Sequence, residues 1–521
     1  MSLSRKVLVA STIVLALFCV PRSVHAMKVG AGMHQPDDWA TIQYFKDLFK
    51  QARLWGVLPA SGNWDYVHAH LGRTDGPMAA SELRADGYPK QVPTTQGQRV
   101  CTIMMANMLP QAYPFGTYTL MFEGTGEVYL GWDAGGPATN YVEGSIGQGH
   151  GITVTGSGGT TTRAFTIASS ASFYGHYCES GNGSGILLHI MRSEASDPVH
   201  NIRVIMPDRS GGTSYVADHE TQPFNPVALE DLRMYNNFRF MDWCFAFSSQ
   251  ISNWDDWPTL QTCGPARGYG FSGFANAYEW MCLLGNALHR DIWINLPYKA
   301  TNDDFMRNMA RVVHQTLAPD RTVYIEYANE IWNTAEAYLP QMIYLNGQAG
   351  SWGVSGWEQA QAYVSGKLFK AFRDEFGSES GRVVNVLCGF NLDPGLTSTL
   401  LGNIANNSIN PTGVRADAFA TAPYIYSNNV GTLAANAASA AGQGANHTGA
   451  AGSAGVSLIT YEGGQHQVVG DVIGTNHDPQ MYDVYTTYLN SAKNYFTMLQ
   501  QYISHGSWGM EGAWGAKQYY G

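Results

Sequence analysis

Short apolar segments alternate with amphipathic helical segments from about residue 207 onwards in this 521-residue chain. The strand candidates in this part are 238–243, 292–296, 323–327, 383–387, 418–424 and 456–461. Strands that alternate with helices form a parallel sheet whose faces the helices cover. A strand at 27–33 and a last one near 506–509 bring the number to eight, which favours a closed barrel over an open sheet. We therefore predict an α/β fold, a (β/α)8 TIM-type barrel.

The clearest helical pattern covers 303–317, where Phe305, Met309 and Val313 recur on one face. Asn302 stands directly before this pattern and is placed to cap the helix. Helical patterns also cover 39–52, 357–376 and 479–503. Only about a dozen residues follow the eighth strand candidate, too few for a full eighth helix, so either the barrel lacks that helix or the number of strands is off by one.

Residues 76–206 have a different texture from the rest of the chain. Short strand-like segments such as 117–122 and 186–190 are separated by glycine-rich turns, and no helix-length pattern appears. Regularly spaced short strands with turn signals are typical of a β-sandwich, which we predict as an insertion into the barrel. The predicted division is 1–26 signal peptide, 27–75 first part of the barrel, 76–206 inserted β-sandwich and 207–521 remainder of the barrel.

The N-terminal segment has the pattern of a secretory signal. Arg5 and Lys6 supply the positive start, an apolar run covers 7–20, and Val24-His25-Ala26 offers a small-residue cleavage site. The run is too short to span a bilayer, although a retained N-terminal anchor is the alternative. We expect a secreted or periplasmic protein that is not attached to a membrane after removal of 1–26.

Composition restricts the partners. The formal net charge of −11 argues against nucleic acid or anionic membrane as a partner. Few charged residues (14%) and many aromatic ones (12%) suit neutral polar ligands, because flat rings offer apolar faces to sugars.

Six cysteines remain beyond the signal and permit disulfides; the pairing stays open, with Cys101 and Cys178 as our first choice. No Cys/His cluster has zinc spacing, so we predict no metal or cofactor. The oligomeric state is not predicted.

Two predicted barrel strands end in glutamate. One segment ends its strand at Asn329-Glu330, and another ends at Glu462. Active sites of parallel barrels lie at the carboxyl ends of the strands. Hydrolysis of a glycosidic bond requires two carboxyl groups, one to deliver a proton and one to attack or to activate water. Glu326 shares the face of Glu330 and is either a rival carboxylate or a partner of Arg239.

The segment Tyr327-Ala328-Asn329-Glu330-Ile331-Trp332-Asn333 resembles the acid/base motif of the clan GH-A glycoside hydrolases, in which an Asn-Glu pair closes the fourth strand. Tyr461-Glu462-Gly463-Gly464 resembles the nucleophile segment that closes their seventh strand. The resemblance covers roughly 207–515 and extends to bacterial secreted members with an inserted β-domain. One departure is Ala422 two residues before Tyr424, where many members have a histidine.

The resemblance implies roles for individual residues. Glu330 is the expected acid/base, Glu462 the expected nucleophile, and Asn329 the expected partner of the sugar 2-hydroxyl. Tyr424 and Arg239 are expected to hold the charge of Glu462. The remaining substrate-binding candidates are Trp508 as a stacking floor, Trp332, Trp243 and His466. The alternatives are a packed strand-end tyrosine for Tyr424, a structural ion pair for Arg239, a core position for Trp508 and a solvated loop position for His466.

The predicted function is retaining, endo-acting hydrolysis of β-linked polysaccharide. The alternative is a non-catalytic carbohydrate-binding or surface-assembly protein on a degenerate barrel, since a fold alone does not establish a function. Carboxyl groups about 5–5.5 Å apart would favour retention and about 6.5–9.5 Å would favour inversion.

Overall fold

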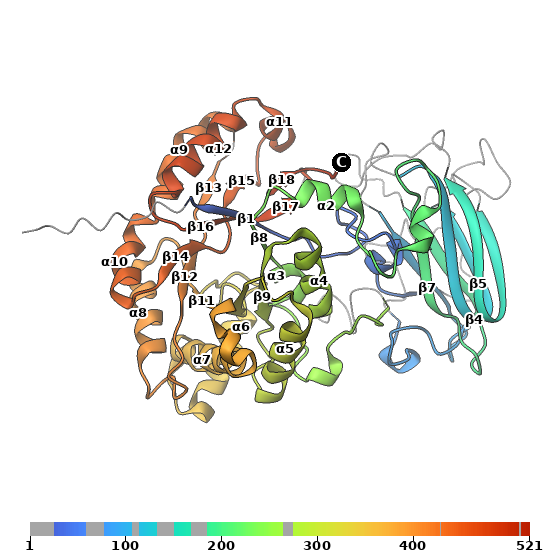
Figure 1. Ribbon diagram of the computed structural model, residues 1–521, viewed down its shortest axis with the longest axis horizontal. Coiled ribbons are helices and arrows are strands. Elements are labelled where there is room, and N and C mark those ends of the chain that lie inside the picture. Colours follow the sequence, from blue (N-terminus) through green and yellow to red (C-terminus); the bar gives the residue numbers. More distant parts are fainter. Residues whose placement is uncertain are drawn as a thin grey trace, which may run out of the picture.

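The computed structural model describes residues 26–58, 78–106, 114–132, 151–167, 185–263, 275–427, 429–509 and 512–521. It contains a parallel barrel and, beside it, an antiparallel sheet (Figure 1). Residues 1–25 lie outside the described part, so the signal peptide stays a prediction, as does the pairing of Cys178. Within the described residues, no helix has the length and apolar character that crossing a membrane requires.

Eight parallel strands form the barrel, and the prediction of this fold class is confirmed. In barrel order they are β1 (Lys28–Gly32), β8 (Asn237–Arg239), β9 (Asp291–Leu296), β10 (Val323–Tyr327), β11 (Val383–Cys388), β12 (Ala418–Thr421), β14 (Ser457–Thr460) and β16 (Met498–Gln501). The last strand pairs with the first, with Lys28 opposite Met498. Thr497 N donates to Leu458 O at 3.0 Å and brings β14 beside β16, which nearly closes the barrel.

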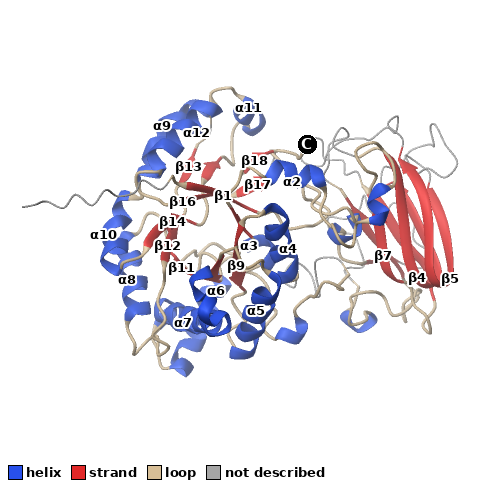
Figure 2. Ribbon diagram, in the orientation of Figure 1, coloured by secondary structure: helices blue, strands red, loops and turns tan. Residues whose placement is uncertain are grey.

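Helices surround the barrel strands (Figure 2). The main ones are α4 (Tyr278–Leu288), α5 (Asp303–Thr316), α6 (Leu339–Ala349), α7 (Gly356–Phe376), α8 (Pro394–Ala405), α9 (Val430–Gly442), α10 (Ala445–Ala454) and α12 (Met481–Ala492). As expected from the sequence, no helix follows β16 among the described residues; the chain instead ends in the short strands β17 (Ile503–His505) and β18 (Gly515–Lys517).

Helix α5 follows the sequence pattern closely. The Asn302 side chain accepts a hydrogen bond from Phe305 N at 2.8 Å, as an N-cap residue does. Phe305, Met309 and Val313 are buried on the face that packs inward. The capping prediction at Asn302 is therefore confirmed.

The predicted helix at 39–52 is wrong. Only a short 3-10 turn, Leu48–Gln51, forms there. Phe45 forms an isolated antiparallel β-bridge with Phe224, and Asp47 forms one with Ile205, so this segment is extended at both positions. The apolar residues that suggested one helical face are buried by the barrel and the antiparallel sheet together, so their spacing is not set by a helix.

The eighth strand lies earlier than the sequence suggested. The helical pattern at 479–503 contains α12, which ends at Ala492, and then β16, Met498–Gln501. All four residues of β16 are buried, so apolar periodicity alone could not separate this strand from the helix before it. The proposed strand at 506–509 is not a barrel strand.

The antiparallel sheet contains β2 (Gly56–Leu58), β3 (Arg99–Met104), β6 (Ile186–Ser193), β4 (Gly116–Trp132), β5 (Gly151–Ile167) and β7 (His200–Ile205). Strands β4 and β5 pair along most of their 17 residues each. Because β2 pairs with β3, the sheet begins inside the range that the sequence assigned to the first part of the barrel. The described strands of the insertion belong to this one sheet, and the second sheet that a sandwich needs stays a prediction.

We expect Asn302→Ala to lower the free energy of unfolding by about 1 kcal/mol, because the first turn of α5 loses its cap acceptor. Asn302→Ser keeps a cap acceptor and should lose much less; both variants lose the hydrogen bond from Asn302 Nδ2 to Ser252 O at 2.6 Å, so the difference between them reports the cap. Urea unfolding of both variants tests this, and an equal loss in the two would contradict the capping account.

Candidate active site

Functional side chains gather where the barrel strands end. Arg239 is the last residue of β8, and Glu326 lies near the end of β10. Asn329 and Glu330 follow β10, and Glu462 follows β14. The carboxyl ends of parallel strands share one mouth of the barrel, so residues far apart in sequence meet there.

Arg239 links these segments and is only 2% exposed. Its Nη1 donates to Glu462 Oε1 at 2.7 Å, and its Nη2 donates to Asn329 Oδ1 at 2.8 Å. Its Nε and Nη2 also donate to both oxygens of Glu326. A buried guanidinium is tolerated only when carboxylates and hydrogen bonds compensate its lost hydration. The structure therefore holds the ends of β8, β10 and β14 in one ionic network.

Glu326 is a buried carboxylate partner of Arg239. Trp293 Nε1 and Asn295 Nδ2 donate to its Oε2 at 2.9 and 2.8 Å, in addition to Arg239. It is 2% exposed and does not line the cavity described below. Of the two interpretations of Glu326, a rival carboxylate or a partner of Arg239, the geometry supports the partner.

Glu462 has a donor for each carboxyl oxygen. Arg239 holds Oε1, and the Tyr424 hydroxyl donates to Oε2 at 2.8 Å. Tyr424 begins β13 (Tyr424–Tyr426), which follows the sixth barrel strand. Both contacts were expected from the resemblance, and the geometry places them on the same carboxyl group.

The described side chains that donate to Glu330 are uncharged. The Tyr461 hydroxyl donates to its Oε1 at 2.7 Å, and Asn333 Nδ2 donates to its Oε2 at 2.8 Å. Its backbone is left-handed, with φ of 50°, and so is that of Ala328, with φ of 60°. Non-glycine residues seldom adopt this region, and they do so where surrounding contacts fix them.

The contacts that fix this turn come from side chains. Asn295 Nδ2 donates to Ala328 O at 2.8 Å. Gln341, on α6, receives a hydrogen bond from Asn329 N at 3.2 Å and donates to Asn329 O at 2.7 Å. The turn after β10 therefore directs the side chain of Asn329 to Arg239 and the side chain of Glu330 into the cavity described below.

Burial dominates the electrostatics of both carboxyl groups. Burial raises the pKa of Glu330, while the hydrogen bonds from Asn333 and Tyr461 lower it. Burial raises the pKa of Glu462 to about 8; the charge of Arg239 opposes this rise, the charge of Glu330 adds to it, and the hydrogen bond from the Tyr424 hydroxyl opposes it. Of the two groups, Glu462 is the one that contacts a cation directly within the described residues.

Both carboxyl groups open into one cavity of about 360 Å³. The lining residues are Glu330, Trp332, Asn333, Tyr338, Phe390, Asn391, Ala422, Tyr424, Tyr426, Tyr461, Glu462, His466, Tyr502 and Trp514. Among the described residues, this lining contains no lysine or arginine, and burial lowers the pKa of His466. In the same part of the chain, no group of three or more His, Cys, Asp or Glu side chains is arranged to hold a metal ion.

Most of the predicted site residues meet at this cavity. Glu330, Glu462, Tyr424, Trp332 and His466 line it. Arg239 and Asn329 are buried beside it: Arg239 donates hydrogen bonds both to Asn329 and to Glu462.

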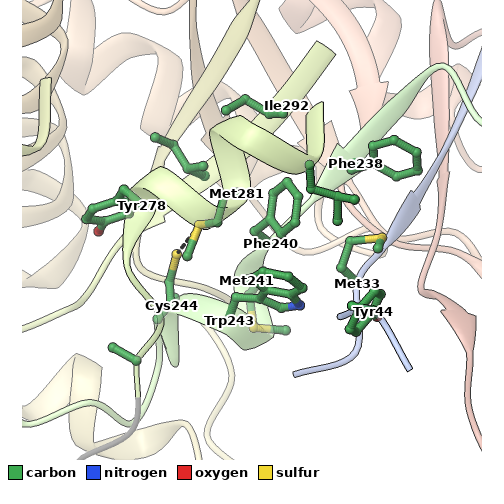
Figure 3. Close-up of a cluster of buried hydrophobic side chains, with 14 of the residues drawn as sticks. Met33, Tyr44, Phe238, Phe240, Met241, Trp243, Cys244, Tyr278, Met281 and Ile292 are labelled. Atoms are coloured by element: carbon green, nitrogen blue, oxygen red, sulfur yellow. Dashed lines mark hydrogen bonds between the residues drawn. The ribbon is translucent and has the colours of Figure 1, made fainter. Parts of the chain in front are cut away.

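Two predicted substrate-binding tryptophans lie elsewhere and need correction. Trp243 is completely buried, packs against Tyr44 and Phe240, and donates to His34 O, so no ligand reaches it (Figure 3). Trp508 is outside the cavity lining: it packs with Val472 and Ala513 and donates to Gly515 O at 3.1 Å. Their indole rings pack in hydrophobic cores. Aromatic residues are common both in cores and at ligand-stacking sites, and the sequence alone does not separate the two.

Several cavity residues were not found from the sequence. They are Tyr338, Phe390, Asn391, Tyr426, Tyr502 and Trp514. Phe390 and Asn391 follow the fifth barrel strand, so the rule that located the glutamates would have found them too. Tyr502 follows β16 directly and was missed because that strand was taken for the end of a helix.

No protein-family model and no curated protein matches the chain. Among solved structures, a 4-O-α-L-rhamnosyl-β-D-glucuronidase from Fusarium oxysporum 12S is similar, with 14% identity and a TM-score of 0.34 over 57% of this chain and 65% of that one. An α-L-arabinofuranosidase from Thermotoga maritima has 12% identity and a TM-score of 0.39, over 56% of this chain and 59% of its own. A GH10 xylanase from Bispora sp. MEY-1 has 10% identity and a TM-score of 0.31, over 54% and 79%. The chain spans less than two thirds of the length of the first two proteins.

Proposed function

We propose that this chain is a retaining glycoside hydrolase that cleaves β-linked polysaccharide, with Glu330 as acid/base and Glu462 as nucleophile. The observation that carries the proposal is the pair of buried glutamates that line one cavity with unequal donors. Glu462 contacts the Arg239 guanidinium, whereas Glu330 contacts only a tyrosine hydroxyl and an amide. Two carboxyl groups in one site whose surroundings differ in this way can divide the acid and nucleophile roles.

The proposed reaction has two displacements. In the first, a Glu462 oxygen bonds to the anomeric carbon, the glycosidic C–O bond breaks, and Glu330 gives its proton to the leaving oxygen. In the second, water attacks the same carbon, Glu330 takes a proton from that water, and the bond to Glu462 breaks. Glu330 is thereby protonated again and Glu462 is again a carboxylate.

We propose that Asn329 assists at the sugar. Its Oδ1 accepts from Arg239 at 2.8 Å, and its buried Nδ2 has no hydrogen-bond partner within the described ranges. A buried amide N–H without a partner is costly, so a substrate hydroxyl that accepts from it is favoured. We assign this contact to the 2-hydroxyl, where it can strengthen in the transition state.

An uncharged substrate fits the charge of the cavity. Its described lining holds two carboxyl groups and no cation, so an acidic sugar would meet repulsion without a compensating partner. The aromatic residues around the mouth favour a polysaccharide chain and internal cleavage. Secretion, proposed from the signal-like N-terminus, would bring the protein to such polymers.

We expect Glu330→Gln and Glu462→Gln each to lower kcat on a cleaved polysaccharide by about 10²–10⁴-fold. The amide keeps the shape of the side chain, so the thermal midpoint of Glu330→Gln should stay within about 4 °C, whereas Glu462→Gln also removes a carboxylate from the buried Arg239 and should lower the midpoint further. Reducing-end release and calorimetry measure the two quantities. Glu336→Gln, at an exposed glutamate, is the control and should change neither. Near-wild-type activity of either cavity variant would disprove the assignment, and wild-type binding without hydrolysis would favour the non-catalytic alternative.

The pH profile should respond to two matched tyrosine variants. Tyr424 lowers the pKa of Glu462, so Tyr424→Phe should raise that pKa and move the acidic limb of kcat/KM to higher pH by roughly one pH unit. Tyr461 lowers the pKa of Glu330, so Tyr461→Phe should raise that pKa and move the basic limb to higher pH. Each limb is expected to move in one variant only. The reverse pattern would exchange the roles of the two glutamates.

A further inference from the structure

Two residues of the cavity lining each have a buried polar side-chain atom without a partner among the described residues. Trp332 Nε1 and Asn391 Oδ1 are buried, and neither has a hydrogen-bond partner within the described part of the chain. Both residues line the cavity, and Asn391 is 7% exposed. One atom is a donor and the other an acceptor. Leaving either unsatisfied costs free energy, so the pair is suited to a ligand that carries hydroxyl groups.

An aromatic pair adjoins these atoms. The rings of Trp332 and Phe390 stack with centroids 4.3 Å apart and an interplanar angle of 28°. Both rings belong to the cavity lining. Trp332 follows the fourth barrel strand and Phe390 follows the fifth, and these two strands pair directly. The wall therefore combines aromatic surface with hydrogen-bonding atoms, which is the combination that sugar rings require.

The position of Asn391 is fixed from outside the barrel. Its carbonyl oxygen lies 2.8 Å from Nε2 of His447, on α10, and His447 Nδ1 lies 2.7 Å from Thr397 Oγ1, on α8. Burial lowers the pKa of His447, so the neutral ring donates to Asn391 and accepts from Thr397. Asp393 N also donates to Phe390 O at 3.0 Å. A residue held in this way is ordered before a ligand arrives, which reduces the entropy lost on binding.

This wall lies on the side of the proposed acid. Trp332 is two residues after Glu330, and the intervening turn is tied by the hydrogen bond from Asn333 to Glu330. Glu462 and Tyr424 come instead from the seventh and sixth barrel strands. A general acid must reach the oxygen of the leaving group, whereas the nucleophile approaches the anomeric carbon from the opposite face.

We infer that Trp332, Phe390 and Asn391 form the subsite for the leaving-group sugar, an uncharged ring whose hydroxyls accept from Trp332 Nε1 and donate to Asn391 Oδ1. This inference rests on the proposed hydrolase function. It also orients the polysaccharide in the cavity, with the departing sugar beside Trp332, Phe390 and Asn391. The subsite recognises a ring on the departing side, so the enzyme cleaves bonds between sugars far better than bonds to small alcohols.

Three probes separate the subsite from the acid. A β-linked tetraose (cello-, xylo-, manno- or laminaritetraose) needs the acid and fills the subsite. The matching methyl β-bioside needs the acid but offers no ring, and the matching biosyl fluoride needs neither. Asn391→Ala and Trp332→Phe should each lower kcat/KM on the tetraose about tenfold, because each removes one hydrogen bond to the departing sugar. Both should leave the methyl bioside and the fluoride within about twofold of wild type.

Trp332→Phe keeps an aromatic ring against Phe390. A lower kcat/KM on the tetraose in this variant therefore reports the missing indole N–H and not the ring stacking. Trp352→Phe is the matched control: Trp352 stacks on Tyr363 away from the cavity and should affect no probe. Equal losses on tetraose and methyl bioside would show damage to the acid and overturn the subsite, as would unchanged tetraose cleavage. A wild-type protein that hydrolyses none of the three probes in any series would instead count against the hydrolase function itself.

Discussion

The buried guanidinium of Arg239 determines much of the geometry at the mouth of the barrel. A cation without hydration is tolerated only where carboxylates and hydrogen bonds replace the water. Arg239 meets this requirement with Glu326, Glu462 and Asn329, which come from the fourth and seventh strands. Closure of the barrel and assembly of the site are thus linked, because the network is complete only when β8, β10 and β14 stand in register.

The network also separates three carboxyl groups by depth. Glu326 lies beneath, surrounded by donors, and neutralises the guanidinium. Glu462 shares the same cation but reaches the cavity, and Glu330 reaches it from the other side with uncharged donors alone. Unequal surroundings for two glutamates in one cavity are what a proton donor and a nucleophile need. The cavity wall beside Glu330 contains the aromatic pair Trp332 and Phe390 together with Asn391, so the two ends of the cavity differ.

The sequence was sufficient for what depends on short-range pattern and strand order. The buried strands at 292–296 and 323–327, the cap at Asn302 and the glutamates at strand ends could all be predicted. Tertiary environment decided the rest. The four buried residues of β16 extend a helical pattern without a break, and Trp243 and Trp508 fill cores that a single chain does not reveal. Asn391 belongs to no motif; its position after the fifth barrel strand is its one sequence signal, and the structure shows that it lines the same cavity as Trp332.

Identification of the residue that bonds to the sugar is the most direct test of this account. A 2-deoxy-2-fluoro-β-glycosyl fluoride, matched to a sugar that the protein releases, slows the second displacement and lets the covalent intermediate accumulate. Mass spectrometry of the digested protein should then find one glycosyl group on the peptide that contains Glu462, and none in Glu462→Gln. A label on Glu330 or Glu326 would contradict the account.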